Sequence, residues 1–314
     1  MTSILDVIFP VFFLIAAGYA AAKTSLFDEG GRKGLNDFTL YFCLPSLLFR
    51  TMQAVDLGVA EPWGIWGAYF LAAIAIWLSV ALAFRRVPGL GDAGGAGTAF
   101  ASTFGNVGMM GLSIAYLRFG EEGVVAGAMI VAIHASTHWL AGTLWAEWAQ
   151  RGRNVAVLPM VGGVLVSLAK NPIVLSLALG AAWNAAGLRM PAGAENVIGL
   201  LGDAAVPVGL FALGMAVAAY PIRGALPGVA TILALKMIAL PLAAWALSAY
   251  VFSLPPLQAA VVTLFAALPT GVNPYLFSSR FNASTPAVSG AIALGVMVSI
   301  VTIPLVLFLV APAS

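Results

Sequence analysis

Apolar residues fill this chain in long runs, and short polar connections separate the runs. A helix needs about 20 apolar residues to cross the hydrocarbon core of a bilayer, and ten runs are close to that length. They are Ile4–Ala22, Leu35–Met52, Trp63–Phe84, Gly94–Leu117, Gly123–Trp148, Pro172–Gly187, Val197–Ala219, Leu226–Tyr250, Pro256–Ser279 and Pro286–Val310. The pattern predicts an all-α integral membrane protein with ten transmembrane helices, numbered as spans 1 to 10.

The composition agrees with a bilayer as the surrounding solvent. Of the 314 residues, 61% are hydrophobic and only 8% are charged, whereas charged residues make up about 25% of an average soluble domain. The net charge of +2 is too small to suggest a nucleic-acid partner. Cys43 is the single cysteine, so no internal disulfide is expected. The first residues contain no basic segment, so span 1 is expected to be a permanent helix rather than a cleaved signal peptide.

Basic residues are distributed unevenly among the connections. The odd-numbered connections hold ten of them and the even-numbered connections hold three. The ten are Lys23, Arg32, Lys33, Arg85, Arg86, Arg151, Arg153, Lys170, Arg223 and Arg280, and the three are Arg50, Arg118 and Arg189. Cytoplasmic loops carry the excess of lysine and arginine. Both termini are therefore predicted to face outward, and a bacterial inner membrane is the expected location.

Two spans are interrupted near their middle by residues that break helices. Span 4 contains Phe104-Gly105-Asn106-Val107-Gly108-Met109-Met110-Gly111-Leu112-Ser113, and span 9 contains Leu268-Pro269-Thr270-Gly271-Val272-Asn273-Pro274. In hydrocarbon, the freed backbone groups must find partners or line a wet cavity. Interrupted spans at corresponding positions of two halves point to the binding site of a transporter. The alternative is that both are structural kinks.

The two halves of the chain repeat. A shift of 162 residues aligns landmarks of spans 1, 2 and 4 with those of spans 6, 7 and 9. The aligned pairs are Pro10 with Pro172, Gly18 with Gly180, Pro45 with Pro207, Phe49 with Phe211, and Arg118-Phe119 with Arg280-Phe281. Because each half has five spans, an odd number, the second half is predicted to be inverted in the membrane, as in secondary transporters.

Several of these segments resemble motifs of one family, the auxin efflux carriers, which includes bacterial malate and malonate permeases. The segments are Asn106-x-Gly108-Met109-x-Gly111, Pro269-Thr270-Gly271-Val272-Asn273, Asp203-Ala204-Ala205-x-Pro207-x-x-Leu210-Phe211-x-Leu213-Gly214 and Lys236-x-x-x-x-Pro241. The resemblance covers all ten spans. It departs from the family pattern at Ser113, where many members have a proline.

The resemblance implies the fold of bile-acid and sodium/proton transporters, in which two broken helices cross near the bilayer centre. It also implies a scaffold made of spans 1, 2, 6 and 7, and a moving transport domain made of the other spans. The expected divisions are 1–56 for scaffold spans 1 and 2, 63–148 for transport spans 3 to 5, 155–221 for an interfacial helix and scaffold spans 6 and 7, and 226–310 for transport spans 8 to 10. The interfacial helix is predicted as an amphipathic segment over Val155–Lys170.

The interruptions favour an anionic ligand. The N-terminus of a helix carries roughly +0.5 of a charge and unpaired N–H groups, and neither interruption contains Asp or Glu to neutralise it. We therefore expect a carboxylate at this site, and little sodium dependence, because hard cations favour carboxylate ligands. The predicted substrate-binding residues are Asn106, Gly108, Met109, Gly111, Ser113, Pro269, Thr270, Gly271, Val272 and Asn273.

The two asparagines have two possible roles, since they can donate an amide to the substrate or cap freed backbone groups. Asn273 is expected at the N-cap of the second half-helix, with Pro274 in its first turn. Pro274 together with Pro45 and Pro207 forms the predicted set of helix breaks or hinges.

Four ionisable residues are further candidates. Lys236, in the middle of span 8, is expected to offset the negative C-terminal ends of the broken helices, with direct contact to the substrate as the alternative. His134 and His138 share a helix face, either as packing residues or as a proton relay. No third histidine exists, so no metal is expected. Asp203 is expected to form a hydrogen bond within the scaffold, or else to take up a proton.

Together these features predict a secondary-active transporter of small organic anions that works by alternating access, without a cofactor. A homodimer through the scaffold spans is expected. A passive anion channel or facilitator of the same fold is the alternative. An intramembrane hydrolase is disfavoured, because Ser136 lies two residues from both His134 and His138, and i, i+2 neighbours on a helix do not face each other.

Overall fold

The computed structural model describes residues 4–24, 26–54, 62–84, 92–151, 157–220 and 226–310, and these residues are helical with no β-strand apart from one isolated bridge. Six helices are long and apolar enough to cross a membrane, or up to seven if one bent pair is a single span. The predicted all-α, multi-pass membrane protein is confirmed. Arg85, Arg86, Arg153, Arg223 and both chain ends lie outside the described residues.

The number of sufficiently long helices is smaller than ten because several predicted spans are divided into shorter helices. The uninterrupted helices α1 (Ile4–Lys23), α4 (Pro62–Phe84) and α15 (Thr285–Val310) each match one prediction. Predicted span 9 instead comprises α13 (Pro256–Ala267) and α14 (Asn273–Phe281), neither of which could cross alone.

Prolines account for most of the remaining bends, because proline lacks an N–H and its ring disturbs the preceding turn. A π-helical turn therefore precedes Pro45 and another contains the residues before Pro241, while α9 gives way to α10 at Ala204, before Pro207. The elements concerned are α2 (Glu29–Phe38), η1 (Thr39–Cys43), α3 (Leu44–Ala54), α9 (Ala192–Asp203), α10 (Ala205–Val217), α11 (Leu226–Ala234), η4 (Leu235–Ala239), α12 (Leu240–Ala246) and η5 (Leu247–Val251).

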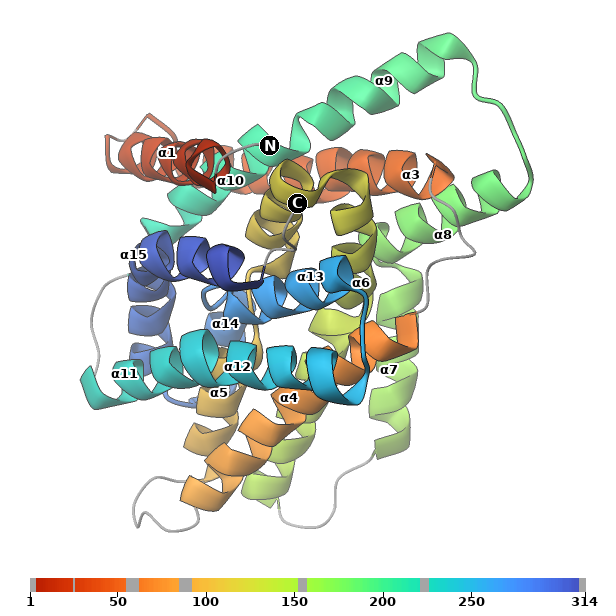
Figure 1. Cartoon of the computed structure of the whole chain (residues 1–314). Coiled ribbons are helices and arrows are strands. Elements are labelled where there is room, and N and C mark those ends of the chain that lie inside the picture. Colours follow the sequence, from red (N-terminus) through yellow and green to blue (C-terminus); the bar gives the residue numbers. More distant parts are fainter. Residues whose placement is uncertain are drawn as a thin grey trace.

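Helix α6 (Leu112–Arg151) reverses direction at Gly120, so that its two arms lie side by side (Figure 1). Gly120 has φ 65° and ψ −152°, a conformation that glycine adopts without steric cost. The turn falls between predicted spans 4 and 5, so α6 holds the end of span 4 before Gly120 and the whole of span 5 after it.

The segment Val155–Lys170, predicted to form an amphipathic interfacial helix, is helical over most of its length. A helix, α7 (Val157–Ala169), forms there, but Ser167 is its only polar residue, and Leu165 and Val166 are exposed. Helix α7 and α8 (Pro172–Ala185) together are apolar enough to span a membrane, with a bend of 59° between them.

Two helix pairs pack at very short range through glycines. On α10, a Cβ added at Gly214 would lie 2.0 Å from the carbonyl oxygen of Ile15, and one at Gly18 would lie 2.0 Å from that of Phe211. On α8, a Cβ at Gly180 would lie 2.8 Å from the carbonyl oxygen of Phe49. Small residues allow backbones to approach closely, which is how helices associate where water supplies no hydrophobic drive.

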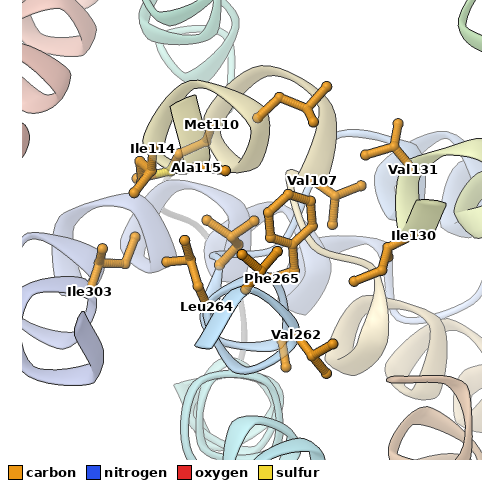
Figure 2. Packing of buried hydrophobic residues seen from close by; sticks show 14 of the residues in the cluster. Val107, Met110, Ile114, Ala115, Ile130, Val131, Val262, Leu264, Phe265 and Ile303 are labelled. Carbon is orange, nitrogen blue, oxygen red and sulfur yellow. The ribbon is translucent and has the colours of Figure 1, made fainter. Parts of the chain in front are cut away.

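The largest buried cluster surrounds the interrupted helices, and many large apolar side chains on the outer helix faces are exposed. Figure 2 shows Leu264 and Phe265 of α13 facing Val107 and Met110, which lie within the first interrupted segment, and all four are buried. Outside this core, apolar side chains such as Phe9, Phe13 and Leu309 are exposed, as expected for residues in contact with lipid.

The α1–α10 contact leads to a stability prediction. Gly214→Ala places a methyl group inside the contact distance of a backbone oxygen, so the two helices must separate. We expect a loss of about 1–3 kcal/mol in stability, the usual cost of overpacking. Thermal unfolding of the detergent-purified protein measures it. Gly162→Ala on α7 is the matched control, because a Cβ there meets no atom within 4 Å; an equal melting temperature for both variants would contradict the close contact.

Candidate functional site

The two interruptions pair with each other. Helix α5 (Asp92–Thr103) ends just before Gly105, which forms an isolated antiparallel bridge with Thr270. The Asn106 N–H donates to the Pro269 carbonyl at 3.0 Å, and the Gly271 N–H donates to the Phe104 carbonyl at 3.0 Å. Each interruption thus supplies the partners that the other requires in a medium without water.

The non-helical part of each interruption is short, residues 104–106 in the first and residues 268–272 in the second, and a helix begins directly after each part. The π-helical turn η3 (Val107–Gly111) starts after Asn106 and continues into α6, and α14 starts after Val272. Pro274 lies in the first turn of α14, as predicted. The predicted N-cap position of Asn273 is wrong, because Val272 occupies it and Asn273 is the first helical residue.

Neither asparagine serves as a side-chain cap. Asn106 and Val272 occupy the cap positions of η3 and α14 without a side-chain hydrogen bond to the helix. Within the described residues, no hydrogen bond is found for the amide group of Asn106 or Asn273, and both residues are half-buried. Their amides are therefore free to meet a ligand beside the N–H groups of two helix starts.

The C-terminal ends of the two preceding helices are occupied by donors. The Lys236 ammonium donates to the Ala266 carbonyl in the last turn of α13 at 2.5 Å, and Lys236 is completely buried. The Thr270 hydroxyl donates to the Ala101 carbonyl in the last turn of α5 at 3.0 Å. A cation or hydroxyl at a helix C-terminus stabilises its negative dipole end. This geometry corresponds to the dipole-offsetting role expected for Lys236.

Lys236 also lies beside the first interruption. A Cβ added at Gly105 would lie 3.2 Å from the Lys236 Nζ. One ammonium group thus contacts the end of α13 and approaches the segment after α5. An ammonium group has three N–H donors, so one can stay on the Ala266 carbonyl while another meets a substrate.

The other predicted binding residues divide into two groups. Gly111 packs inward, since a Cβ there would lie 2.8 Å from Leu268, and Ser113 donates its hydroxyl to the Met109 carbonyl at 2.5 Å. A serine bonded to the carbonyl four residues earlier tends to bend a helix, a function that proline would serve at this position. Gly108 instead has open space, and Met109 is half-buried near Gly209 of α10.

The histidine pair lies next to the first interruption. The ring centroids of His134 and His138 are 4.3 Å apart, and the ring of Phe104 lies 4.4 Å from that of His134. His138 Nδ1 is 2.8 Å from the His134 carbonyl oxygen. Sequence reasoning missed Tyr69, whose ring lies 5.6 Å from that of His134 and whose buried hydroxyl has no hydrogen-bond partner among the described residues. A tyrosine in the middle of an apolar span was the available signal.

Asp203 lies away from the interruptions. Its carboxylate accepts a hydrogen bond from Arg50 Nη1 at 2.8 Å, which joins α9 to α3. Arg50 also approaches the Gly199 carbonyl at 3.5 Å. The geometry corresponds to the expected hydrogen bond within the predicted scaffold. Pro45 lies at the start of α3, and Pro207 lies in the first turn of α10, the helix that follows α9.

Known proteins that resemble this chain are transporters. The chain is 26% identical over 320 residues to a Rhizobium meliloti protein described as a "Putative malonate transporter", covering 99% of this chain and 97% of that protein. It is 24% identical over 321 residues to the Escherichia coli uncharacterized transporter YfdV, covering 97% of each. A rice protein, auxin efflux carrier component 3a, is 30% identical over 139 residues, which are 42% of this chain and 22% of the rice protein.

The family resemblance and the expectation that the chain is not an enzyme are both confirmed by these relatives, which also exclude the hydrolase alternative. A family model described as "Membrane transport protein" matches residues 3–307, nearly the whole chain. The chain therefore belongs to this auxin efflux carrier-like family of membrane transporters.

Proposed function

We propose that the protein is a secondary-active transporter of small organic anions, chiefly carboxylates, and that the substrate binds where the two interruptions meet. One observation carries the proposal. The side-chain amides of Asn106 and Asn273 make no hydrogen bond to the two helix N-termini beside which they lie. The two neighbouring C-terminal ends, by contrast, already accept hydrogen bonds from Lys236 and Thr270. The unsatisfied part of the site is therefore electropositive, which suits an anion.

The repeat of five spans supports a crossing of two broken helices at this site. Gly18 packs on the carbonyl of Phe211, and Gly180 packs on the carbonyl of Phe49. These two contacts exchange under the same shift of 162 residues that aligns the halves. The shift also relates Gly120 to Asn282, and both have positive φ, 65° and 51°. Matching contacts in both halves favour the inverted ten-span architecture, with spans 1, 2, 6 and 7 as the scaffold.

The transport cycle follows from this division. Rocking of the transport domain, which carries both interruptions, against the scaffold would expose the anion to each side in turn, which is alternating access. A scaffold-mediated homodimer would hold the scaffold still. The printed name of the Rhizobium relative makes malonate the first substrate to test.

Reconstitution in proteoliposomes tests the proposal. Labelled malonate, other small carboxylates and a cationic amino acid are offered with and without pH and sodium gradients. We expect carboxylate accumulation above the outside concentration without a sodium requirement. Equilibration that never exceeds the outside concentration would favour the passive facilitator, and uptake of the cation alone would overturn the anion site.

The first variant is Asn273→Ala. Loss of a charge-assisted hydrogen bond, about 1.5–3 kcal/mol, should weaken carboxylate binding roughly tenfold to a hundredfold with little change in thermal stability. The same is expected for Asn106→Ala. Gln258→Ala removes a similar amide from α13 and serves as the control. A fall in stability with unchanged affinity per folded molecule would show that Asn273 is structural.

Two substitutions distinguish a structural role of Lys236 from direct contact with the substrate. Lys236→Met leaves the Ala266 carbonyl without its donor, so stability should fall by about 1.5–3 kcal/mol and transport should be lost. Lys236→Gln keeps a donor and should recover part of the stability. Direct substrate contact, the alternative, predicts that Lys236→Gln unfolds like the wild type yet binds carboxylate much more weakly.

Orientation is tested by cysteine labelling after Cys43→Ala. We propose that the chain lies in the cell membrane with both termini outside. Gly193→Cys should then react with an impermeant maleimide on intact cells, and Gly34→Cys only after permeabilisation. Both glycines have open space for the new side chain. The reverse labelling pattern would invert the orientation.

A further inference from the structure

A cavity of about 500 Å³ lies apart from the paired interruptions, between the second arm of α6, α7 and the end of α14. Ser136, Trp139 and Thr143 line it from one face of α6, and Ser167, Asn171 and Arg280 line it from the other elements. Its volume falls within the range of about 300–1,000 Å³ typical of small-molecule sites. The lining thus combines one guanidinium with hydroxyl and amide groups.

Arg280 is the charged residue of this lining, and it has no salt bridge within the part of the chain that the structure describes. Its guanidinium carbon lies 5.4 Å from the ring centre of Phe281. Glu147, one helical turn beyond Thr143, has an interaction of its own and does not line the cavity. The cavity therefore presents a positive charge without a carboxylate in its wall.

An aromatic layer separates the cavity from the paired interruptions. The ring of Trp139, which lines the cavity, lies 5.7 Å from the rings of Phe100 and Phe277. Phe100 stacks on Phe104 at 5.3 Å, and the Phe104 carbonyl accepts the Gly271 N–H of the second interruption. The rings of Trp139, Phe100 and Phe104 thus form a continuous line of contacts from the cavity to the paired interruptions.

We propose that this cavity is a second binding site for the carboxylate substrate, an entry vestibule in which Arg280 captures the anion before it reaches the paired interruptions. The identity of the anion rests on the proposed function. Under the proposed orientation, Arg280 lies at the cytoplasmic end of span 9. A guanidinium binds a carboxylate through two parallel N–H donors, and the hydroxyls of Ser136 and Ser167 add polar groups to a wall that is otherwise largely apolar.

Arg118 supplies a matched control. It is the counterpart of Arg280 under the shift of 162 residues, and its guanidinium carbon lies 5.7 Å from the ring centre of Phe119. It also precedes a residue with positive φ, Gly120, as Arg280 precedes Asn282. Arg118 does not line the cavity. Effects that arise only from a cation at a helix end should therefore appear in both variants.

The test measures occupancy of the cavity directly. Ser167→Cys in the Cys43→Ala protein is reacted with a charged methanethiosulfonate while malonate is titrated. We expect malonate to slow the reaction, and Arg280→Gln to raise the malonate concentration for half protection about tenfold to a hundredfold. Arg118→Gln should leave that concentration unchanged. Equal effects of the two variants, or no protection by malonate, would overturn the vestibule.

Two further measurements distinguish the vestibule from a lipid headgroup site and from the proposed function itself. The reaction is repeated in phosphatidylcholine nanodiscs with and without phosphatidylglycerol; protection by the anionic lipid but not by malonate would make the cavity a lipid headgroup site and overturn the proposal. Malonate uptake without cavity protection would overturn the vestibule and leave the proposed function standing. Cavity protection without uptake would support anion capture and contradict the proposed function.

Discussion

Every part of this site depends on satisfying backbone groups in a medium that offers no water. Proline and glycine residues open two helices at mid-span, and each opening exposes N–H and C=O groups that hydrocarbon cannot solvate. The protein meets this cost by pairing the openings, through the Asn106–Pro269 and Phe104–Gly271 hydrogen bonds. The pairing brings residues more than a hundred and fifty positions apart in the sequence into one place, and it orients the helix ends around them.

Where the two interruptions pair, the negative helix ends are neutralised and the positive helix ends are not. Two helices end at the site with negative dipole ends, and two begin there with positive ends. Lys236 and Thr270 occupy the negative ends, while the asparagine side chains leave the positive ends uncapped. The asymmetry turns a structural necessity into a candidate anion site, and it does so without an acidic residue in either opening.

The packing around the site is of two kinds, backbone contacts at glycines and contacts between aromatic side chains. Glycine-mediated contacts between α1 and α10 and between α3 and α8 leave no room for a side chain, and such interfaces resist sliding because interiors are close-packed. Around Phe100, by contrast, the contacts are between stacked and edge-on aromatic side chains rather than between backbones. The difference matches the proposed division into a fixed scaffold and a moving part with an aromatic partition beside its site.

The sequence alone determined that the chain is helical and lies in a membrane, where the two interruptions are, and that they contain no acidic residue. Composition, the length of hydrophobic runs and the position of prolines are local properties, and they suffice for these conclusions. The sequence also supplied the repeat and the family motifs. Only the tertiary structure decided that Val272, not Asn273, is the cap of α14, that Lys236 bonds the Ala266 carbonyl, and that Tyr69 lies beside His134. The same holds for the cavity beside Arg280. These features depend on which distant segments meet and on atomic distances between them, and neither hydrophobic period nor residue spacing contains that information.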